Sequence, residues 1–371
     1  MELPDRERKA ATMTAKRTLN VWAQGDAHVG RDKAHGRDSL AEALIQSEFG
    51  DGHGASPFDW DIAINVGDYC GDVGVPTDEE GEEVVRQFGV LKKHRREQVY
   101  SVSGNHDRSG LDRPEGEWFR RYVDPMGENT AVSGVDAARY PFPVEGTWER
   151  YKFETGNLVF LMMSDVNERS HAKGRGDLGG NPGGVVTAET YAWWRQQVSE
   201  NRDKIIVSVH HYMLKDTTLA SGLWEGMKKG ADGNWMQDYH GYFPEGSPAG
   251  ASFLCWVGGQ FDSGRFERYL AENPGAVDLW LGGHSHDNPD GRKGGKTSVE
   301  QAYGGTTFMN ICPLTRYVVP AHAIPHSGLL TFTDGSDEML ARCYMHTDEY
   351  RPRGWYDAVE RRIRLSAAVR L

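Results

Sequence analysis

Five short polar clusters, each placed where an apolar run ends, constrain the fold of this chain more than any other feature. The apolar runs predict buried strands at Leu19 to Ala23, Ile62 to Val66, Val99 to Val102, Ile205 to Val209 and Val277 to Leu281. The clusters that follow them are Gly25-Asp26-Ala27-His28, Gly67-Asp68-Tyr69-Cys70-Gly71, Gly104-Asn105-His106-Asp107, His210-His211 and Gly283-His284-Ser285-His286. Ligands bind outside the carboxyl ends of the strands in open α/β sheets, so the clusters predict one binding site at the rim of a sheet.

The segments between the clusters predict helices, and the last third of the chain is rich in strands. Helices are expected at Ser39 to Phe49 after a Ser39-x-x-Glu42 capping box, from a second capping box at Thr77-x-x-Glu80, at Thr187 to Ser199 and near Arg265 to Ala271. Further strands are expected in the hairpins Tyr151 to Ser164 and Gly328 to Tyr344, and at Thr306 to Ile311. The pattern predicts an α/β fold of two packed mixed β-sheets flanked by helices, a four-layer α/β/β/α sandwich.

The chain is interpreted as one elaborated domain, residues 18–350, with additions at both ends. Residues 1–17 are expected to be disordered, and residues 351–371 are expected to form a basic helical tail that packs on its own domain or on a second copy in a homo-oligomer. The glycine- and aromatic-rich insertion at about 212–256 is expected to form a lid or pocket wall that selects the organic part of a ligand.

Composition narrows the class of partner and the compartment. The formal net charge of −12 disfavours nucleic acid, whose phosphates an acidic protein repels. The 4 cysteines are widely scattered and form no disulfide framework, and the chain shows neither a signal peptide nor an apolar run of membrane-spanning length. The expected location is the cytoplasm, and the expected partner is a small molecule.

The side chains of the five clusters form a donor set for transition metals. They combine imidazole, carboxylate and amide groups without thiolate, in Asp26, His28, Asp68, Asn105, His106, His210, His284 and His286. Such donors suit manganese, iron, zinc, cobalt or nickel and are too rich in nitrogen for a calcium or magnesium cage. Eight side chains are too many for one ion but suit two divalent or trivalent ions that share a carboxylate, for which Asp68 is the natural bridge.

The order of these motifs resembles the signature of the calcineurin-like metallophosphoesterases, with a weaker resemblance to their cyclic-nucleotide and glycerophosphodiester phosphodiesterase branch. The resemblance implies a first metal held by Asp26, His28, Asp68 and His286, and a second held by Asp68, Asn105, His210 and His284. It also implies that His106 faces the substrate, as leaving-group acid or phosphoryl-oxygen stabiliser, with Asp107 orienting its ring.

One position departs from the family pattern. The usual His-His-Pro after the fourth strand is His210-His211-Tyr212 here, which leaves open which histidine is the ligand. His210 is predicted because it directly follows the strand, and the alternative roles for His211 are substrate contact or support of the ligands.

The expected activity is hydrolysis of a small-molecule phosphate ester by a hydroxide that bridges two metal ions, with a phosphodiester favoured and a phosphomonoester as the other option. Two alternatives stay open. A nuclease of the same fold is disfavoured by the acidic balance. A noncatalytic metal-binding scaffold module is the third possibility, because fold alone never fixes function.

Overall fold

The computed structural model describes most of the chain. Side chains are described for residues 16–71, 74–108, 117–166, 184–222, 253–254, 257–258, 264–311, 313–316 and 323–371, and the backbone alone at 227–229, 235–237, 255–256 and 260–261. The expected disorder of residues 1–17 therefore falls almost wholly outside the described residues. The same holds for the predicted lid or pocket wall, of which mainly the two flanks, 212–222 and 253–258, are described.

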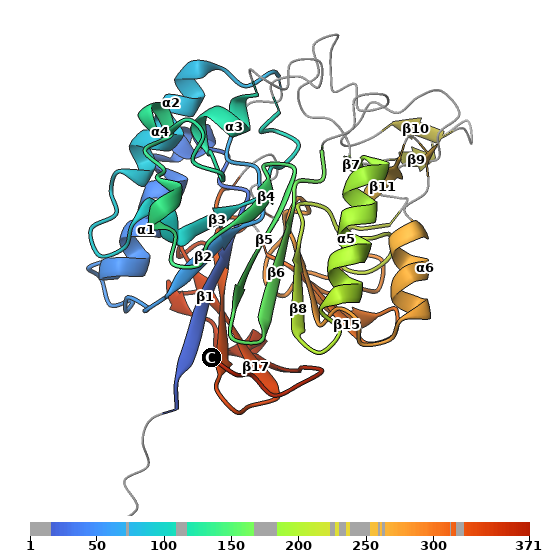
Figure 1. The fold of residues 1–371 in the computed structure, drawn as a ribbon. Coiled ribbons are helices and arrows are strands. Elements are labelled where there is room, and N and C mark those ends of the chain that lie inside the picture. Colours follow the sequence, from blue (N-terminus) through green and yellow to red (C-terminus); the bar gives the residue numbers. More distant parts are fainter. Residues whose placement is uncertain are drawn as a thin grey trace, which may run out of the picture.

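Two seven-stranded mixed sheets form the centre of the molecule (Figure 1). The first runs in the order β18 (Gly354–Trp355), β17 (Glu338–Met345), β16 (His326–Thr333), β1 (Thr18–Gln24), β2 (Ile62–Asn65) and β3 (Val99–Ser101), with β19 (Arg361–Arg364) also paired to β17. The second runs in the order β14 (Val299–Ala302), β15 (Thr306–Asn310), β13 (Leu279–Gly282), β8 (Ile205–Val209), β6 (Leu158–Met163), β5 (Arg150–Thr155) and β4 (Glu145–Thr147). In the second sheet the parallel strands β6, β8, β13 and β15 lie between the antiparallel neighbours β5 and β14. In the first sheet the parallel strands β1 to β3 have an antiparallel neighbour, β16, beside β1 and end at the edge strand β3.

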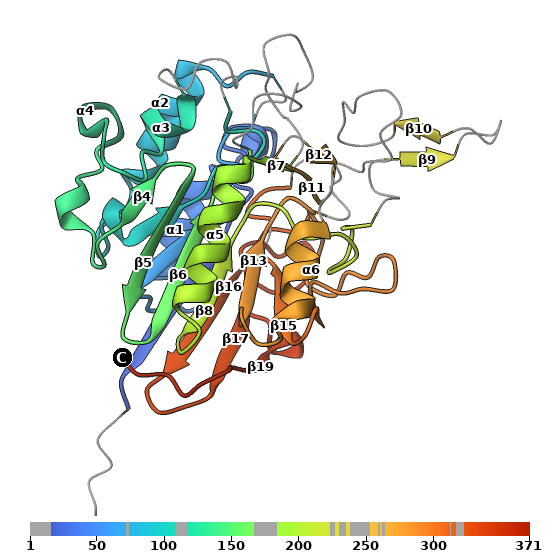
Figure 2. The same ribbon diagram turned by 45° about the vertical axis from the view of Figure 1, so that its right-hand side comes forward.

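Helices cover the outer faces of both sheets (Figures 1 and 2). The helices beside the first sheet are α1 (Ser39–Phe49), α2 (Asp78–Phe88), α3 (Trp118–Tyr122) and α4 (Thr130–Ser133), and those on the second are α5 (Ala188–Glu200) and α6 (Gly264–Glu272). Short 3₁₀-helices occur at Arg31–His35, Arg96–Gln98, Ala137–Arg139 and Asp357–Val359. Two small sheets add β7 (Gly184–Val186), β11 (Leu254–Val257) and β12 (Gln260–Phe261), and separately β9 (Met227–Lys229) and β10 (Trp235–Gln237).

Alternation along the strands builds the layers. In β1, Val21 and Ala23 pack into the core between the two sheets, while Trp22 packs beneath α1. In β8, Val207 belongs to the core between the sheets and Ile206 to the core beneath α5 and α6. Burying one such side chain contributes about 1.5–3 kcal/mol, so three apolar interfaces hold four layers together. The predicted α/β/β/α sandwich of two mixed sheets is confirmed.

The two expected capping boxes have different outcomes. At α2 the box is present: Thr77 Oγ1 accepts a hydrogen bond from Glu80 N at 3.3 Å, and Glu80 Oε2 accepts one from Thr77 N at 3.0 Å. At α1 the residue before the helix is Asp38, and the predicted box is wrong. The Ser39 hydroxyl instead donates to the carbonyl of Ala27, which ties the start of α1 to the first polar loop.

The C-terminal tail is not the helix that its charge pattern suggested. Residues Arg361–Arg364 form strand β19, antiparallel to β17, with Met339 opposite Ile363. Ile363 and Leu365 are buried, whereas Arg361, Arg362 and Arg364 are exposed. The spacing of Ile363 and Leu365 is the period of two of a strand, so their alternation decides the structure.

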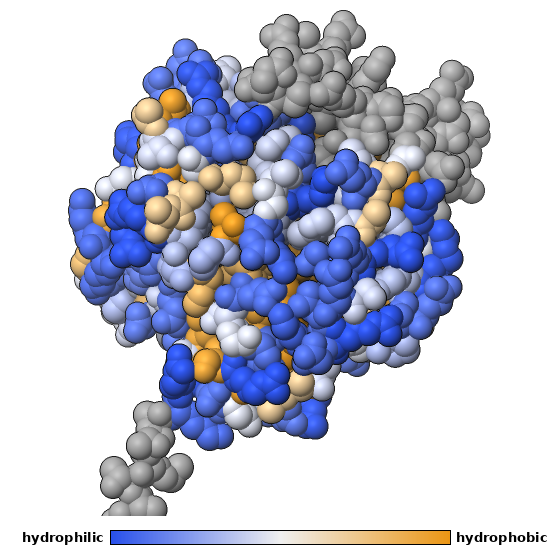
Figure 3. All heavy atoms as spheres, viewed as in Figure 1, coloured by the Kyte–Doolittle hydropathy of each residue, from blue (hydrophilic) through white to orange (hydrophobic). Residues whose placement is uncertain are grey.

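The visible surface of the described residues is mostly polar (Figure 3). On the face shown in Figure 3, hydrophilic residues cover most of the surface and hydrophobic ones form small groups. Within the described part of the chain, no helix combines the length and the hydropathy that crossing a bilayer requires.

Candidate metal centre

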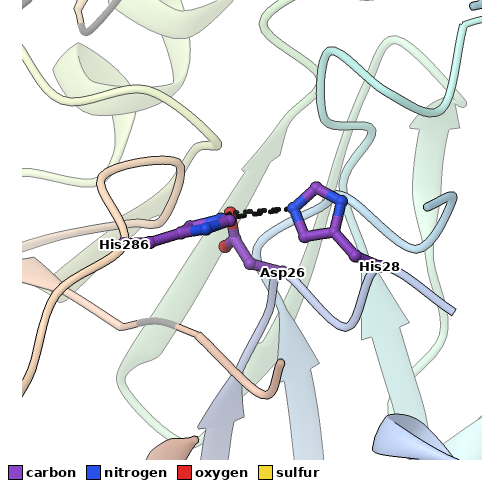
Figure 4. Close-up of side chains that lie close together, drawn as sticks. All are labelled: Asp26, His28 and His286. Carbon is purple, nitrogen blue, oxygen red and sulfur yellow. Dashed lines mark hydrogen bonds and ion pairs between the residues drawn. The ribbon is translucent and has the colours of Figure 1, made fainter. Parts of the chain in front are cut away.

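A first cluster of metal-type ligands is formed by Asp26, His28 and His286, whose ligand atoms all lie within 4.8 Å of one another. Asp26 and His28 come from the loop after β1, and His286 comes from the loop after β13. Figure 4 shows the rings of His28 and His286 on either side of the Asp26 carboxylate. His286 Nε2 lies 2.9 Å from Asp26 Oδ1 and 3.2 Å from His28 Nε2. Residues 258 positions apart in sequence thus meet at one point.

Hydrogen bonding assigns the tautomer of His28. Its Nδ1 lies 2.9 Å from the carbonyl oxygen of Cys70, an acceptor only, so Nδ1 carries the proton. In the neutral ring, Nε2 then presents a lone pair toward His286 and Asp26. Histidine ligands of metal ions are commonly fixed by a carbonyl in this way.

A second cluster joins Asp68, His211 and His284, again with ligand atoms within 4.8 Å of one another. Asn105 lies among them: its Oδ1 is 2.9 Å from His211 Nε2 and 2.9 Å from His284 Nδ1. His211 Nδ1 lies 2.8 Å from the carbonyl of Val66 and donates to it, which leaves Nε2 facing the carboxamide oxygen. A proton or a metal ion on Nε2 satisfies this contact between a ring nitrogen and an oxygen.

Asp68 lies between the two clusters. Its Oδ2 is 3.6 Å from His28 Nε2 and 3.3 Å from His211 Nε2, and its Oδ1 accepts a hydrogen bond from His106 N at 2.9 Å. His28, Asp68 and His106 themselves form a third group of ligand-type side chains. One carboxylate therefore faces ligands from both clusters, as a bridging position requires.

The loops hold four of these residues in a conformation that L-residues rarely adopt. Asp26 (φ 52°), His28 (φ 38°), Asp68 (φ 58°) and His284 (φ 68°) lie in the left-handed region. Such conformations cost about 1–3 kcal/mol each and gather at functional sites, where the surrounding structure enforces them. Close packing by glycine is part of that enforcement, because a Cβ on Gly104 would lie 2.1 Å from Asp68 Oδ1 and one on Gly283 would lie 2.3 Å from Asp26 Oδ2.

The residues present fit a pair of transition-metal ions. Asp26 Oδ2 is buried and has no hydrogen-bond partner among the described residues, which is costly for a carboxylate unless a cation satisfies it. The donors are imidazole nitrogens and carboxylate or amide oxygens, the set that manganese, iron, zinc, cobalt and nickel accept.

The charges within the site are strongly coupled. Burial, followed by the positive charge of His106, holds the pKa of His28 well below its usual range. Burial opposes ionisation of Asp68, but the neighbouring His211 and His106 outweigh it and hold the pKa of Asp68 well below its usual range. Burial likewise opposes protonation of His211, yet the Asp68 carboxylate raises the pKa of His211 to about 10. Without a metal ion, the ionised carboxylate of Asp68 and the protonated ring of His211 therefore lie in contact. A metal ion bound there would replace the proton of His211.

The structure places His211, not the predicted His210, in the cluster. His210 points to the opposite face of the sheet: its Nδ1 lies 2.9 Å from Asp165 Oδ1, and its Nε2 lies 2.7 Å from Ser208 Oγ. Both ring nitrogens are engaged there. The alternation of side chains along β8 distinguishes the two histidines. Val207 and Val209 face the core between the sheets, and His211, two residues further on, lies on the same side.

His106 and Asp107, in the loop after β3, lie in different surroundings. The ring of His106 is buried in the cluster, edge-on to His28 with ring centroids 4.6 Å apart. The Asp107 carboxylate accepts four backbone N–H groups at 2.8–2.9 Å, from Asp68, Tyr69, Cys70 and Gly104. Among the described residues the His106 ring is not one of its hydrogen-bond partners, so Asp107 fixes the loops that carry Asp68 and Asn105.

Residues 19–288, which include both clusters, match the calcineurin-like phosphoesterase family. The chain belongs to this family. No curated protein matches the sequence. Among solved structures, the fold is similar to GAP50, the anchor in the inner membrane complex of Plasmodium, at 8% identity and a TM-score of 0.51, covering 95% of this chain and 90% of that one.

Two further structures align with the family member described here. PhoD is 10% identical, with a TM-score of 0.47 and coverage of 96% of this chain and 74% of that one. A predicted phosphoesterase from Streptococcus pneumoniae is 10% identical, with a TM-score of 0.33 and coverage of 94% and 99%. Family membership and the clusters together support metal-dependent hydrolysis of a phosphate ester.

Proposed function

We propose that this family member is a dinuclear metal-dependent phosphoesterase whose two ions share Asp68. The observation that carries the proposal is the position of the Asp68 carboxylate, within 3.6 Å of His28 and 3.3 Å of His211, each of which belongs to a different ligand cluster. Noncatalytic metal binding would not by itself call for a shared carboxylate, whereas paired ions suit an in-line displacement at phosphorus.

The ligands assigned to the first ion are Asp26, His28, Asp68 and His286, and those assigned to the second are Asp68, Asn105, His211 and His284. His211 replaces the predicted His210, because its Nε2 lies among the other donors and the ring of His210 does not. The donor set supports a first-row transition metal, and availability decides which one is bound.

Ions bound there would polarise the phosphoryl oxygens and supply an ionised water as nucleophile at neutral pH. The chain's own residues contribute orientation and proton transfer. Carbonyl groups of Cys70 and Val66 fix His28 and His211 with their Nε2 atoms inward. The main chain of His106 anchors Asp68 through its N–H, and the ring of the same residue is assigned to protonate the leaving alkoxide or to stabilise a phosphoryl oxygen.

The favoured substrate is a small-molecule phosphodiester. The net charge of −12 supports a small ester over a nucleic acid. Preference for a diester rests on the weaker resemblance to diesterase branches of the family, and a monoester is the other outcome of the test.

The decisive experiment combines metal analysis with two model substrates. Purified protein is loaded with manganese, bound ions are counted per chain, and hydrolysis of bis(p-nitrophenyl) phosphate is compared with that of p-nitrophenyl phosphate. Two ions per chain with faster cleavage of the diester is the expected result, and Asp68→Asn should lower both ion binding and turnover. Two bound ions without hydrolysis of either ester would favour the scaffold module, and faster cleavage of single-stranded DNA than of either ester would favour the nuclease.

A further inference from the structure

A buried hydrogen-bonded chain runs beneath the second cluster, on the helix-covered side of the second sheet. Trp194 Nε1 of α5 donates to Ser208 Oγ at 2.9 Å, and the Ser208 hydroxyl lies 2.7 Å from His210 Nε2. His210 Nδ1 in turn lies 2.9 Å from Asp165 Oδ1. Because the Asp165 carboxylate can only accept, His210 Nδ1 donates to it, and in the neutral ring Nε2 then accepts from the Ser208 hydroxyl, whose oxygen accepts from Trp194.

The other oxygen of Asp165 holds the segment that carries the ligand. Asp165 Oδ2 accepts hydrogen bonds from His211 N at 3.0 Å and from Tyr212 N at 2.9 Å. On the far side of the same segment, Trp280 Nε1 donates to the carbonyl of Tyr212 at 3.1 Å, and the Trp280 ring stacks on His210 with centroids 3.6 Å apart. Backbone positions 210–212 are thus fixed from two strands, β8 and β13, and from the end of β6.

Two groups of the second cluster depend on this segment. One is His211, whose Nε2 faces Asn105 and Asp68. The other is His284, against which the ring of Tyr212 packs with centroids 4.4 Å apart. A shift of the segment would move the first group directly and remove the packing of the second.

We infer that Asp165, held by the Trp194–Ser208–His210 chain, is a positioning residue that sets the affinity of the second ion and leaves that of the first nearly unchanged. This inference rests on the proposed dinuclear site. Its physical basis is that, among the hydrogen bonds of the described residues, the Asp165 side chain bonds His210, His211 and Tyr212 and none of the ligands assigned to the first ion. Residues that orient a metal ligand typically alter metal affinity about 10- to 100-fold when changed.

The test uses the full chain, with Mn²⁺ alone as the probe, and measures two stepwise affinities by calorimetry together with ions retained per chain after gel filtration. Asp165→Asn removes the charge and one acceptor, and we expect affinity for one ion to fall about 10- to 100-fold while the other changes less than about twofold. Excess Mn²⁺ should restore the second ion, which a merely unfolded variant would not show.

The matched control is Asp278→Asn. Asp278 is also a buried carboxylate, and it accepts backbone hydrogen bonds from Ile206 N at 2.9 Å and Ser366 N at 2.6 Å, at the other end of β8. This variant should lower thermal stability but keep both affinities. Equal loss of the second ion in both variants would overturn the inference, because general destabilisation of β8 would then explain the effect.

A milder pair of variants keeps the test decisive if Asp165→Asn does not fold. Ser208→Ala breaks the chain at its middle, and Ser327→Ala removes the same pattern in the first sheet, where Trp22 Nε1 donates to Ser327 Oγ at 2.8 Å and Ser327 Oγ lies 2.8 Å from His346 Nε2. Only Ser208→Ala should weaken the second ion. Unchanged affinities in Ser208→Ala overturn the inference, whereas a wild-type chain that binds no pair of ions defeats the proposed function itself.

Discussion

The Nε2 atoms of His28 and His286 lie 3.2 Å apart, closer than two imidazole lone pairs tolerate without a proton or a cation between them. His28 gives its own ring proton to the carbonyl of Cys70 through Nδ1. Its Nε2 can therefore only accept. The pair, with Asp26 Oδ1 at 2.9 Å from His286 Nε2, forms one half of the proposed dinuclear site.

His286→Gln should remove the first ion and spare the second. The amide oxygen of glutamine is a weaker donor than the imidazole nitrogen between Asp26 and His28, and loss of that nitrogen should exceed the roughly 100-fold upper effect of residues that only orient ligands. Metal counting after dialysis should give one ion per chain in place of two. His53→Gln, at an exposed histidine, is the control and should keep both. Two ions in both variants would contradict the assignment of His286.

His106→Asn should slow esters according to their leaving groups. A buried imidazole beside His28 can donate a proton to an alkoxide, and general acid catalysis contributes about 10²- to 10⁴-fold. We expect kcat for an alkyl phosphodiester to fall in that range, and kcat for bis(p-nitrophenyl) phosphate to fall less because p-nitrophenolate leaves without protonation. An equal fall for both would instead identify His106 as a phosphoryl-oxygen stabiliser.

Binding of the second ion should release a proton from His211. The Asp68 carboxylate, acting against burial, raises the pKa of His211 from 6.5 to about 10, so at pH 7 the metal-free folded protein carries a proton there. A cation must displace it, and the second affinity should rise about tenfold per pH unit between pH 7 and 9. Burial, then the charge of His106, lowers the pKa of His28, so this ligand of the first ion is already neutral at pH 7.

The same shift predicts how the metal-free protein responds to alkali. The His211 group, whose pKa is higher in the folded state, stabilises the metal-free fold fully below its unfolded value of 6.5, and this contribution is lost as the pH rises toward about 10.

The proton release on metal binding is measured by calorimetry of Mn²⁺ binding in two buffers of different ionisation enthalpy, and His211→Gln should abolish the release. Binding of both ions with no proton release in the wild type would show that the coupling of His211 to Asp68 is absent.

The hydrophobic pattern of the sequence predicted much of the fold and brought most of the candidate ligands to one edge, because buried strands that alternate with amphipathic helices can form few layer arrangements. The loops after β1, β2 and β3 meet because the carboxyl ends of parallel strands share an edge. The choice between the two histidines after β8 depended on which face of the sheet each side chain points to. Order along the chain favoured His210, whereas continuation of the Val207 and Val209 side selects His211. Asp165 lies outside the five polar clusters, and only tertiary structure brings it to the backbone of His211.

Gly104→Ala should damage both ion sites through a single methyl group. A Cβ at this position would lie 2.1 Å from Asp68 Oδ1 and 2.4 Å from Asp68 N, and the second of these is backbone that cannot rotate away. Overpacking of this kind costs about 1–3 kcal/mol, and the shared carboxylate must move to relieve it. Gly74→Ala is the control, since a Cβ there meets nothing within 4 Å. Urea unfolding of the metal-free chains should show that loss of stability for Gly104→Ala alone, and metal counting should show fewer than two ions. Retention of both ions despite the destabilisation would mean that Asp68 is not the carboxylate the two ions share.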